Sequence, residues 1–107
     1  MSFSTGAALL DAVVLAVVAR EKEGTYGYKI TQNVKSALEL SESTLYPVLR
    51  RLQTEGCLTV HDAPCNGRNR RYYQITEQGR TRLDQARSDW RQYAANITQL
   101  LEGNEDE

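Results

Sequence analysis

The residues with the clearest chemical potential lie in one stretch, SESTLYPVLRRLQTEG, which covers positions 41–56. Its leucine and valine side chains recur at helical spacing and predict a face packed on a core, namely Leu45, Val48, Leu49 and Leu52. The opposite side of the helix carries hydroxyl groups and cations around one proline, namely Ser43, Thr44, Tyr46, Pro47, Arg50 and Arg51. Side chains of these types contact phosphates and base edges when a helix enters the major groove of DNA. We therefore interpret the stretch as a candidate recognition helix.

The same stretch contains its own start and stop signals. Ser41 is suited to cap the helix, Glu42 is favourable in the first turn, and Gly56 favours an end. Pro47 conflicts with this pattern, because a proline inside a helix removes an amide donor and costs about 3 kcal/mol. Two interpretations stay open: the proline shapes the leading turn, or the helix begins later with Ser43 as its cap.

Length and charge restrict the class of protein. A chain of 107 residues fits a single domain, 1–107, with one core. Its formal net charge is −1, but residues 26–76 hold seven basic and four acidic side chains and the rest of the chain carries −4. A basic middle suits contact between one face and a polyanion, whereas the acidic total argues against indiscriminate coating of nucleic acid.

The apolar run at residues 6–19 predicts a buried helix over residues 5–20. It is shorter than the roughly 20 residues of a membrane span, it contains Asp11, and no basic segment precedes it. We therefore expect a cytoplasmic protein whose two cysteines, Cys57 and Cys65, are free thiols. The spacing of these cysteines from His61 does not match a metal site, so we expect no metal and no cofactor.

This first helix is apolar on nearly every face, with Leu9, Leu10, Val13, Val14, Leu15, Val17 and Val18. The core of one small domain does not cover every face of such a helix, so another chain or a ligand is expected to cover part of it. The alternative is a central helix wrapped entirely within the monomer.

A second helix is expected after Gly24, with Thr25 as its cap and apolar residues such as Ile30 and Val34 at helical spacing. Its first turn exposes Tyr26, Tyr28 and Lys29, a position from which phosphates are commonly bound. We expect one of the two tyrosines to pack and the other to contact DNA. Together with the candidate recognition helix, this segment reads as a helix-turn-helix.

After position 56 the apolar period changes from helical to alternating. Leu58 and Val60, and later Tyr73 and Ile75, alternate with polar residues, which predicts two half-buried strands. An Asn-Gly turn signal and three arginines, Arg68, Arg70 and Arg71, lie between or at the ends of these strands. A hairpin with a cationic tip after a helix-turn-helix indicates a wing, whose arginines bind the DNA backbone or minor groove. The alternative is a solvated charged loop.

The last predicted helix covers residues 77–102, with Thr76 as its cap. It carries an apolar seam at heptad spacing, namely Leu83, Ala86, Trp90, Tyr93, Ile97 and Leu100. A long helix with a narrow apolar stripe needs a partner, and we expect a second copy of the chain, joined also through the first helix by Leu9 and Val13. Two-fold symmetry would place two recognition helices about 34 Å apart on a pseudo-palindromic operator. Residues 103–107 are expected to form an acidic tail.

Three segments together resemble a known family: TYGYKI at 25–30, LSESTLYPVLRRLQTEG at 40–56 and GRNRRYYQITEQGR at 67–80. They are similar to the corresponding segments of PadR-like transcriptional regulators, and the single helix after the wing resembles the short, LmrR-like subfamily. The resemblance implies a mainly helical fold with a small β-hairpin: a winged helix-turn-helix over 25–76, plus dimerisation helices over 5–20 and 77–102. It also implies a homodimeric repressor that a small molecule releases from double-stranded DNA.

The resemblance also assigns residues to roles. DNA contact is expected from Tyr26, Lys29, Ser43, Thr44, Tyr46, Arg50, Arg68, Arg70 and Arg71. In LmrR-like proteins a tryptophan of the last helix stacks on flat aromatic compounds at the dimer interface, and Trp90 matches that position, with Ala8 and Ala12 of the first helix beside it. Charged neighbours such as Arg87, Asp89 and Arg91 depart from the pattern, and Trp90 alternatively fills the dimer core.

Two other function classes compete with a DNA-binding regulator. A winged helix that binds protein instead of DNA has the same pattern. An enzyme is not expected, because the chain has one histidine, no glycine-rich phosphate loop and no nucleophile beside a base, so no residue is assigned as catalytic.

Overall fold

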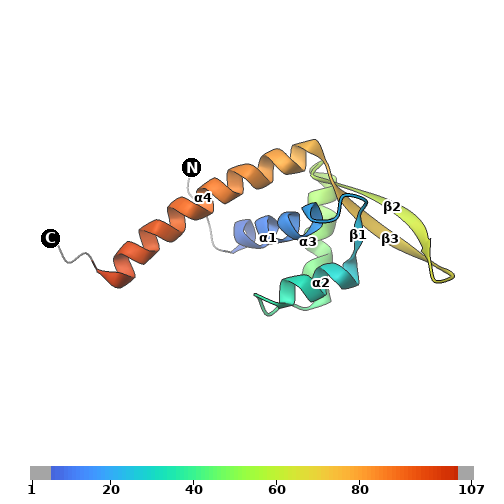
Figure 1. Ribbon diagram of the computed structural model, residues 1–107, viewed down its shortest axis with the longest axis horizontal. Coiled ribbons are helices and arrows are strands. Elements are labelled where there is room, and N and C mark those ends of the chain that lie inside the picture. Colours follow the sequence, from blue (N-terminus) through green and yellow to red (C-terminus); the bar gives the residue numbers. More distant parts are fainter. Residues whose placement is uncertain (1–5, 104–107) are drawn as a thin grey trace.

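A computed structural model describes residues 6–103 of the chain. The elements are α1 (Ala7–Ala19), β1 (Thr25–Tyr26), α2 (Gly27–Lys35), α3 (Glu42–Thr54), β2 (Leu58–Cys65), β3 (Arg68–Ile75) and α4 (Glu77–Glu102). Helices α1, α2 and α3 lie together, the β2–β3 hairpin projects at one end, and α4 extends away at the other (Figure 1). The predicted winged helix-turn-helix with a long C-terminal helix is therefore confirmed. Of the acidic tail expected at 103–107, all but Gly103 lies outside the described residues.

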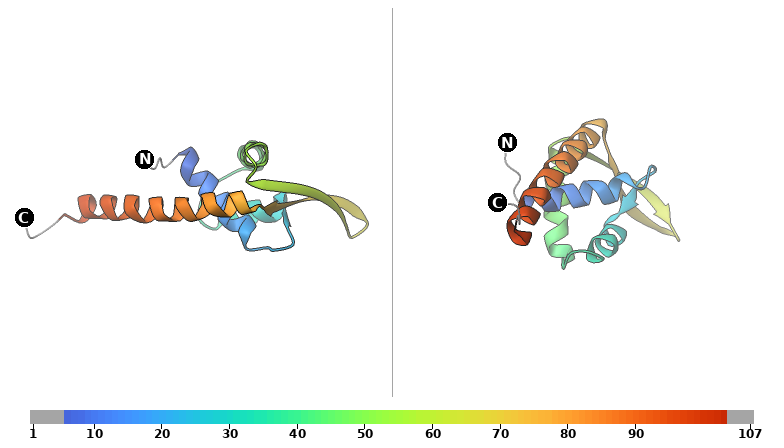
Figure 2. Two further views of the ribbon diagram at one scale, coloured as in Figure 1. Left: turned by 90° about the horizontal axis from the view of Figure 1, so that it is seen from above. Right: turned by 60° about the vertical axis from the view of Figure 1, so that its left-hand side comes forward.

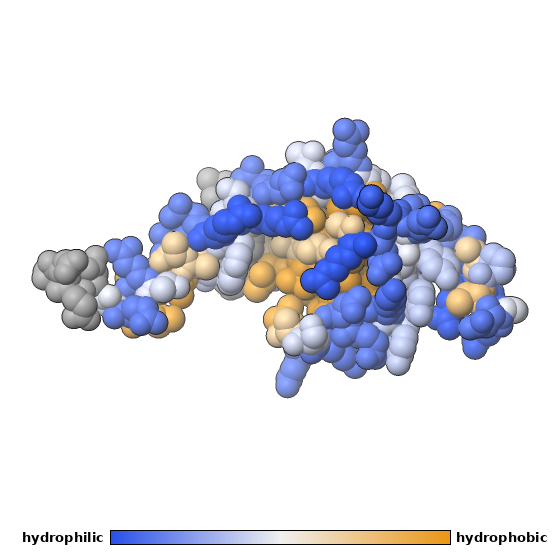
Figure 3. Space-filling view, in the orientation of Figure 1, coloured by the Kyte–Doolittle hydropathy of each residue, from blue (hydrophilic) through white to orange (hydrophobic). Residues whose placement is uncertain are grey.

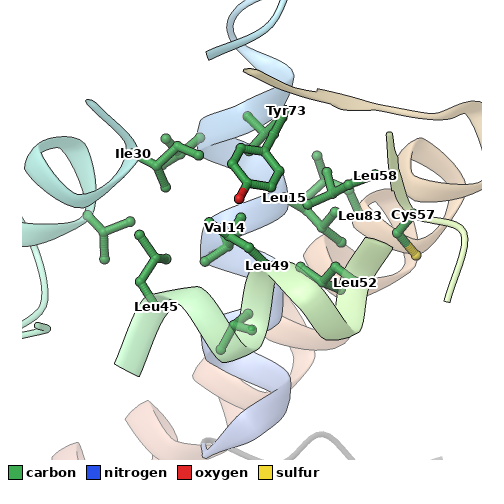
Figure 4. Close-up of a cluster of buried hydrophobic side chains, with 14 residues drawn as sticks. Val14, Leu15, Ile30, Leu45, Leu49, Leu52, Cys57, Leu58, Tyr73 and Leu83 are labelled. Carbon is green, nitrogen blue, oxygen red and sulfur yellow. The ribbon is translucent and has the colours of Figure 1, made fainter. Parts of the chain in front are cut away.

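The core forms where α1, α2, α3, β3 and the start of α4 meet (Figure 4). The four predicted core residues of α3 are all buried, namely Leu45, Val48, Leu49 and Leu52. Helix α1 contributes Val14, Leu15, Val17 and Val18, whereas Leu9, Leu10 and Val13 keep part of their surface exposed. The described chain thus wraps one side of α1 and leaves the N-terminal part of its other side accessible.

Helix α3 has a well-defined boundary at each end. The Ser41 side chain accepts a hydrogen bond from the Thr44 amide, so the helix begins at Glu42 and the alternative start with Ser43 as cap is wrong. At the other end, Gly56 has a φ of 81°, and the Cys57 amide donates to the Leu52 carbonyl in a Schellman arrangement.

Pro47 lies inside α3, in its second turn. Its missing amide leaves the Ser43 carbonyl without the usual helical donor, but both residues are exposed, so water reaches that carbonyl. The penalty is therefore smaller than for a proline in a buried helix.

The sheet has three antiparallel strands in the order β1-β3-β2, one more strand than expected from the sequence. Thr25 pairs with Tyr73, and Tyr26 pairs with Tyr72. The prediction that Thr25 caps α2 is wrong: Thr25 lies in β1, and α2 begins at Gly27 without a side-chain cap. Strand β1 fixes the start of α2 against the base of the wing.

The hairpin turn is the predicted Asn-Gly turn. Asn66 and Gly67 have φ angles of 53° and 79°, as a two-residue type I′ turn requires. Strands β2 and β3 pair in continuous register from Leu58 with Ile75 to Cys65 with Arg68, so both strands are longer than the alternating patterns alone suggested.

The junction between the wing and α4 is held by Thr76. Its hydroxyl oxygen accepts from the Gly79 amide at 2.9 Å and its hydroxyl donates to the Gly56 carbonyl at 2.6 Å, while its own amide donates to the Cys57 carbonyl. The start of α4 is therefore tied to the end of α3. Gly79 is buried in this junction, where a Cβ atom would lie 2.3 Å from the Cys57 carbonyl oxygen and 2.8 Å from Cγ1 of Ile75.

The Gly79→Ala variant tests this junction. We expect it to be destabilised by about 3 kcal/mol, because a methyl group forced against a backbone carbonyl shifts α4 or the wing. Urea unfolding followed by circular dichroism measures the change, with Ser88→Ala on the exposed side of α4 as a control of near-zero effect. A Gly79→Ala midpoint equal to that of the control would contradict the packing described.

The molecule is elongated. Its Cα radius of gyration is 16.1 Å and its extents are 63 × 26 × 21 Å, whereas a compact chain of this length has a radius of about 13 Å. The excess arises because the second half of α4 extends beyond the body, as the left view of Figure 2 shows. None of the helices within residues 6–103 combines the length and apolar content needed to cross a membrane.

Candidate nucleic-acid interface

The solvent-facing side of α3 presents three of the nine residues predicted to contact DNA. Ser43, Thr44 and Arg50 are exposed. The Ser41 hydroxyl lies 2.9 Å from the Ser43 hydroxyl and 3.3 Å from the Thr44 hydroxyl, so the helix begins with a small exposed cluster of donors and acceptors. Arg51 does not belong to this face: its guanidinium binds Asp11 of α1 through two hydrogen bonds. The sequence interpretation that placed Arg51 beside Arg50 on the contact face is therefore wrong.

Tyr46 is half-buried and joins α3 to α2. Its ring packs over Gly27, where a Cβ atom would lie 2.3 Å from the Tyr46 hydroxyl oxygen. Only glycine permits this approach, so Gly27 sets the spacing between the two helices of the helix-turn-helix. Tyr46 borders the contact face but has a clear structural role as well.

A groove of about 410 Å³ separates α3 from the wing and the start of α2. It is lined by tyrosine and arginine side chains from all three segments, with Gly27 and Gln53 completing it: Tyr26, Tyr28, Tyr46, Arg50, Arg70, Arg71 and Tyr73. Burial raises the pKa of the Tyr73 phenol, so this hydroxyl remains protonated at neutral pH. The groove combines cations with aromatic rings, as surfaces that bind nucleic acid do.

The wing arginines differ in their surroundings. Arg70 lies with its guanidinium carbon 4.5 Å from the centre of the Tyr26 ring, and among the described residues it has no hydrogen-bond or ion-pair partner. Arg71 lies opposite Asp62 and forms a long, exposed ion pair of 3.8 Å. Arg68 is exposed at the turn. The cationic tip of the prediction is therefore a cationic strand edge that reaches back from the turn to the groove.

The start of α2 adds a further polar group. Lys29 is exposed and pairs with Glu21 at 3.1 Å, a surface pair that contributes little to stability. Tyr26 is half-buried between Arg70 and Tyr72, whereas 57% of Tyr28 is exposed. Of the two tyrosines, Tyr28 has the more accessible ring, although the resemblance assigned DNA contact to Tyr26.

A second hollow, of about 630 Å³, lies between α1 and α4. Its lining includes Ala8 and Ala12, the two alanines predicted to lie beside an effector, together with Leu15, Ala86 and Asp89. Trp90 is 43% exposed and is not part of its wall in the single chain. In Figure 3 apolar surface is visible below α4, where α1 lies, and again near the far end of α4.

The residues expected at a dimer interface fall into two groups. Leu83 is only 3% exposed and packs in the core of its own chain, so little of its surface remains for a partner. The others keep accessible surface: Leu9, Val13, Ala86, Tyr93 and Ile97 are partly exposed, and Leu100 is 78% exposed.

Neither cysteine forms a disulfide. Cys57 is buried with its sulfur 3.5 Å from Nη1 of Arg82, and Cys65 lies at the end of β2. Within residues 6–103 no group of three or more histidine, cysteine or acidic side chains is arranged to hold a metal ion.

Comparison with known proteins decides the family. The model of the "Transcriptional regulator PadR-like family" matches residues 14–85, which include α2, α3, the wing and the start of α4. The chain belongs to the PadR-like family of transcriptional regulators. The narrower resemblance to LmrR-like proteins remains a prediction.

Individual proteins are similar to this chain in sequence or in fold. Transcriptional regulator Rv3488 of Mycobacterium tuberculosis is 33% identical over 73 residues, 67% of this chain and 68% of its own length. The protein in the crystal structure of smu.1704 from Streptococcus mutans UA159 has 34% sequence identity to this chain. The two structures superpose with a TM-score of 0.85, over 96% of this chain and 95% of that one. Bacillus subtilis PadR in complex with operator DNA is 23% identical; with a TM-score of 0.64 over 72% of this chain and 45% of that one, it shows the fold alone.

Two features of this PadR-like chain were missed in the sequence. Gln53 lines the groove one turn after Arg50, and its position three residues along the same helix was a usable signal. Asp11 was noted only as a charge within an apolar run, yet it is 6% exposed and bound by two arginines. A buried acid requires a cationic partner. The two partners of Asp11 lie 40 and 71 residues away in the sequence, so a local sequence pattern could not identify them.

Proposed function

We propose that this chain is a sequence-specific DNA-binding regulator that acts as a homodimeric repressor and is released by a small aromatic effector. The observation that carries DNA binding is the groove between α3 and the wing. Arg50 has no ion pair among the described residues and lies in the same groove as Arg70 and Arg71. Arg50 of α3 and Arg70 of the wing have no acidic partner among the described residues, and Arg71 has only a long, exposed one, so these cations are available to phosphates and guanine edges. The operator complex of Bacillus subtilis PadR shows that a protein of this fold binds DNA.

The homodimer is supported by the shape of α4. Its second half leaves the body with Trp90, Leu100 and Leu101 exposed by 43%, 78% and 81%. Most helical stability in proteins comes from packing an apolar face against other residues. In a single chain, the second half of α4 lacks most of this stabilisation. A second copy of the chain supplies the missing surface, with Ile97 and Tyr93 in the same seam and Leu9 and Val13 of α1 beside it.

We propose the hollow between α1 and α4 as the effector site. Ala8 and Ala12 leave room there because their side chains are small, and Trp90 offers a flat ring on the same helix as Ala86 and Asp89 of the wall. An effector releases DNA only if it binds the DNA-incompetent arrangement more tightly. A compound that displaces α4 relative to α1 satisfies this condition, because it changes the separation of the two recognition helices.

A salt-titrated mobility-shift assay on the region upstream of the gene itself tests DNA binding. We expect a retarded species at low salt whose affinity falls linearly with salt concentration on logarithmic axes. A winged helix that binds only protein would leave the fragment unshifted even at low salt.

The wing makes a separate prediction in the same assay. Arg68→Ala is expected to weaken binding to all sequences alike and to reduce the salt slope by about 1, because Arg68 contacts a phosphate. Lys35→Ala, an exposed cation at the end of α2 outside the groove, is the matched control. An unchanged slope for Arg68→Ala would place the wing tip away from the duplex.

Fluorescence of the lone tryptophan tests the effector site. We expect flat aromatic compounds that release DNA to quench Trp90 emission at the same concentrations. Compounds that release DNA without any change in Trp90 emission would place the effector elsewhere. The Trp90→Phe variant checks that the signal arises from this ring.

A further inference from the structure

Four charged side chains meet where α1, the end of α3 and the start of α4 approach one another. Asp11 comes from α1, Arg51 and Glu55 from the end of α3, and Arg82 from the second turn of α4. The Asp11 side chain is 8% exposed, whereas Arg51 and Arg82 keep 40% and 39% of their side-chain surface. We call these four residues the Asp11 cluster. It contains two acids and two cations, so it is electrically balanced.

Both oxygens of Asp11 are used. Arg51 donates Nη2 to Oδ1 at 2.7 Å and Nη1 to Oδ2 at 2.8 Å, a planar two-pronged contact, and Arg82 donates Nη2 to Oδ2 at 3.1 Å. The other end of the Arg82 guanidinium binds Glu55. These hydrogen bonds raise the pKa of both guanidinium groups, above all through Asp11 for Arg51 and through Glu55 for Arg82. The geometry of a forked pair is strict, so a shift of one helix breaks it.

The Asp11 cluster lies between the two candidate sites. Asp11 and Arg82 line the hollow between α1 and α4. Arg51, on the other side of Asp11, directly follows Arg50, which lines the groove between α3 and the wing. Both side-chain hydrogen bonds that Arg51 forms within the described residues go to Asp11, and electrostatic interactions with Glu55 and Arg82 add to them. The hydrogen-bonded path from Arg51 to Arg82 of α4 therefore passes through this carboxylate.

We propose that Asp11 is a positioning residue that couples the recognition helix to α4, so that a displacement of α4 against α1 is transmitted to α3. The carboxylate holds Arg51 and Arg82 at one point, and moving either helix leaves a buried acid with one cation instead of two. Because separating the charges costs free energy, the helices are expected to adopt two discrete arrangements and not a continuous range of positions. The consequence for DNA rests on the proposed function, whereas the coupling between the helices does not.

Hydrogen exchange of the free, full-length protein tests the coupling without DNA. We expect Arg51→Gln, a change in α3, to accelerate exchange of the α4 amides at residues 80–86 by about tenfold. In the Asp11→Asn background the same change is expected to have no further effect on these amides. Arg50→Gln is the matched control, because Arg50 is the adjacent arginine and lies outside the cluster; it is expected to leave α4 unchanged. Unaltered α4 exchange in Arg51→Gln would overturn the proposal.

Affinity for the retarded upstream fragment gives the second readout. Asp11→Asn is expected to weaken binding by about tenfold at a temperature where circular dichroism shows it folded. Glu55→Gln leaves the contact between Asp11 and Arg51 in place. It is expected to retain most of the affinity for the fragment even if its melting temperature falls as far as that of Asp11→Asn. If Asp11→Asn does not fold, Asp11→Glu replaces it in the comparison with Glu55→Gln. This variant retains the charge but displaces it by one methylene, and the same loss of affinity is expected. Failure of the wild-type protein to bind any fragment would refute the proposed function, while the exchange result would still decide the coupling.

Discussion

Ile97→Asp is expected to convert the proposed dimer into monomers. It is also expected to lower the affinity for operator DNA by about 10²–10⁴-fold, the gain in affinity that linking two DNA-binding units provides. Ile97 is partly exposed on the seam of α4, between Tyr93 and the exposed Leu100. A carboxylate at this position would have to lose its water in an apolar contact with the partner chain. The fold of the body does not depend on Ile97, because the core is formed by other residues.

Sedimentation velocity measures the mass of the Ile97→Asp variant, and the mobility-shift assay measures its affinity. Ala95→Asp is the matched control: the residue is exposed, lies two positions away on the opposite side of α4, and receives the same charge. A variant at Ile97 that remains dimeric, or a monomer that binds the operator as tightly as wild type, would contradict the assignment of α4.

Arg50→Ala is expected to lower operator affinity by roughly 10- to 100-fold, since a side chain that reads a base edge contributes about 1–3 kcal/mol. The Arg50 side chain is exposed and lies in the groove opposite the wing. Its removal should relax sequence preference at one position of each half-site. The free energy of unfolding should stay nearly constant, because Arg50 has no partner among the described residues to lose.

Fluorescence anisotropy with a labelled operator fragment, and with single-base variants of that fragment, measures both effects. Arg87→Ala provides the control, because Arg87 is an exposed arginine of α4 that borders neither the groove nor the wing. If Arg50→Ala bound with wild-type affinity and preference, α3 would not be the reading element.

The elements that the sequence predicted best are those whose signals are local. The apolar face of α3 repeats within two turns, the cap at Ser41 and the stop at Gly56 lie at its ends, and the Asn-Gly pair specifies a two-residue turn. Helix α4 spans Glu77–Glu102, the range expected from its cap and seam. In each case the residues that decide the structure are close together in the chain.

The features that escaped prediction depend on distant partners. Strand β1 has two residues, and it exists because Thr25 and Tyr26 pair with a strand nearly fifty residues later. Thr25 would be an acceptable helix cap by local criteria, and pairing with β3 overrides that preference. Leu83 fits the heptad seam by spacing, yet it lies in the first turns of α4, where that helix still packs on its own body.

The direction of the two adjacent arginines shows the same limit within the candidate site. Arg50 and Arg51 are about 100° apart around α3, and the sequence alone placed both on the solvent side. Only the position of Asp11 on α1 shows that Arg51 turns inward. The structure exposes Ser43, Thr44 and Arg50 of α3, and their contact with DNA stays a prediction. Tyr28 of α2, which the assigned residues did not include, adds to the same surface.

The mass of the complex between the protein and its operator is the most direct test of a dimer that reads DNA. Sedimentation velocity of a labelled operator duplex with increasing protein, at low salt, is expected to end at a species of one duplex and two chains, because two recognition helices occupy successive major grooves. A complex that saturates with a single chain, or a duplex whose sedimentation never changes, would contradict this account.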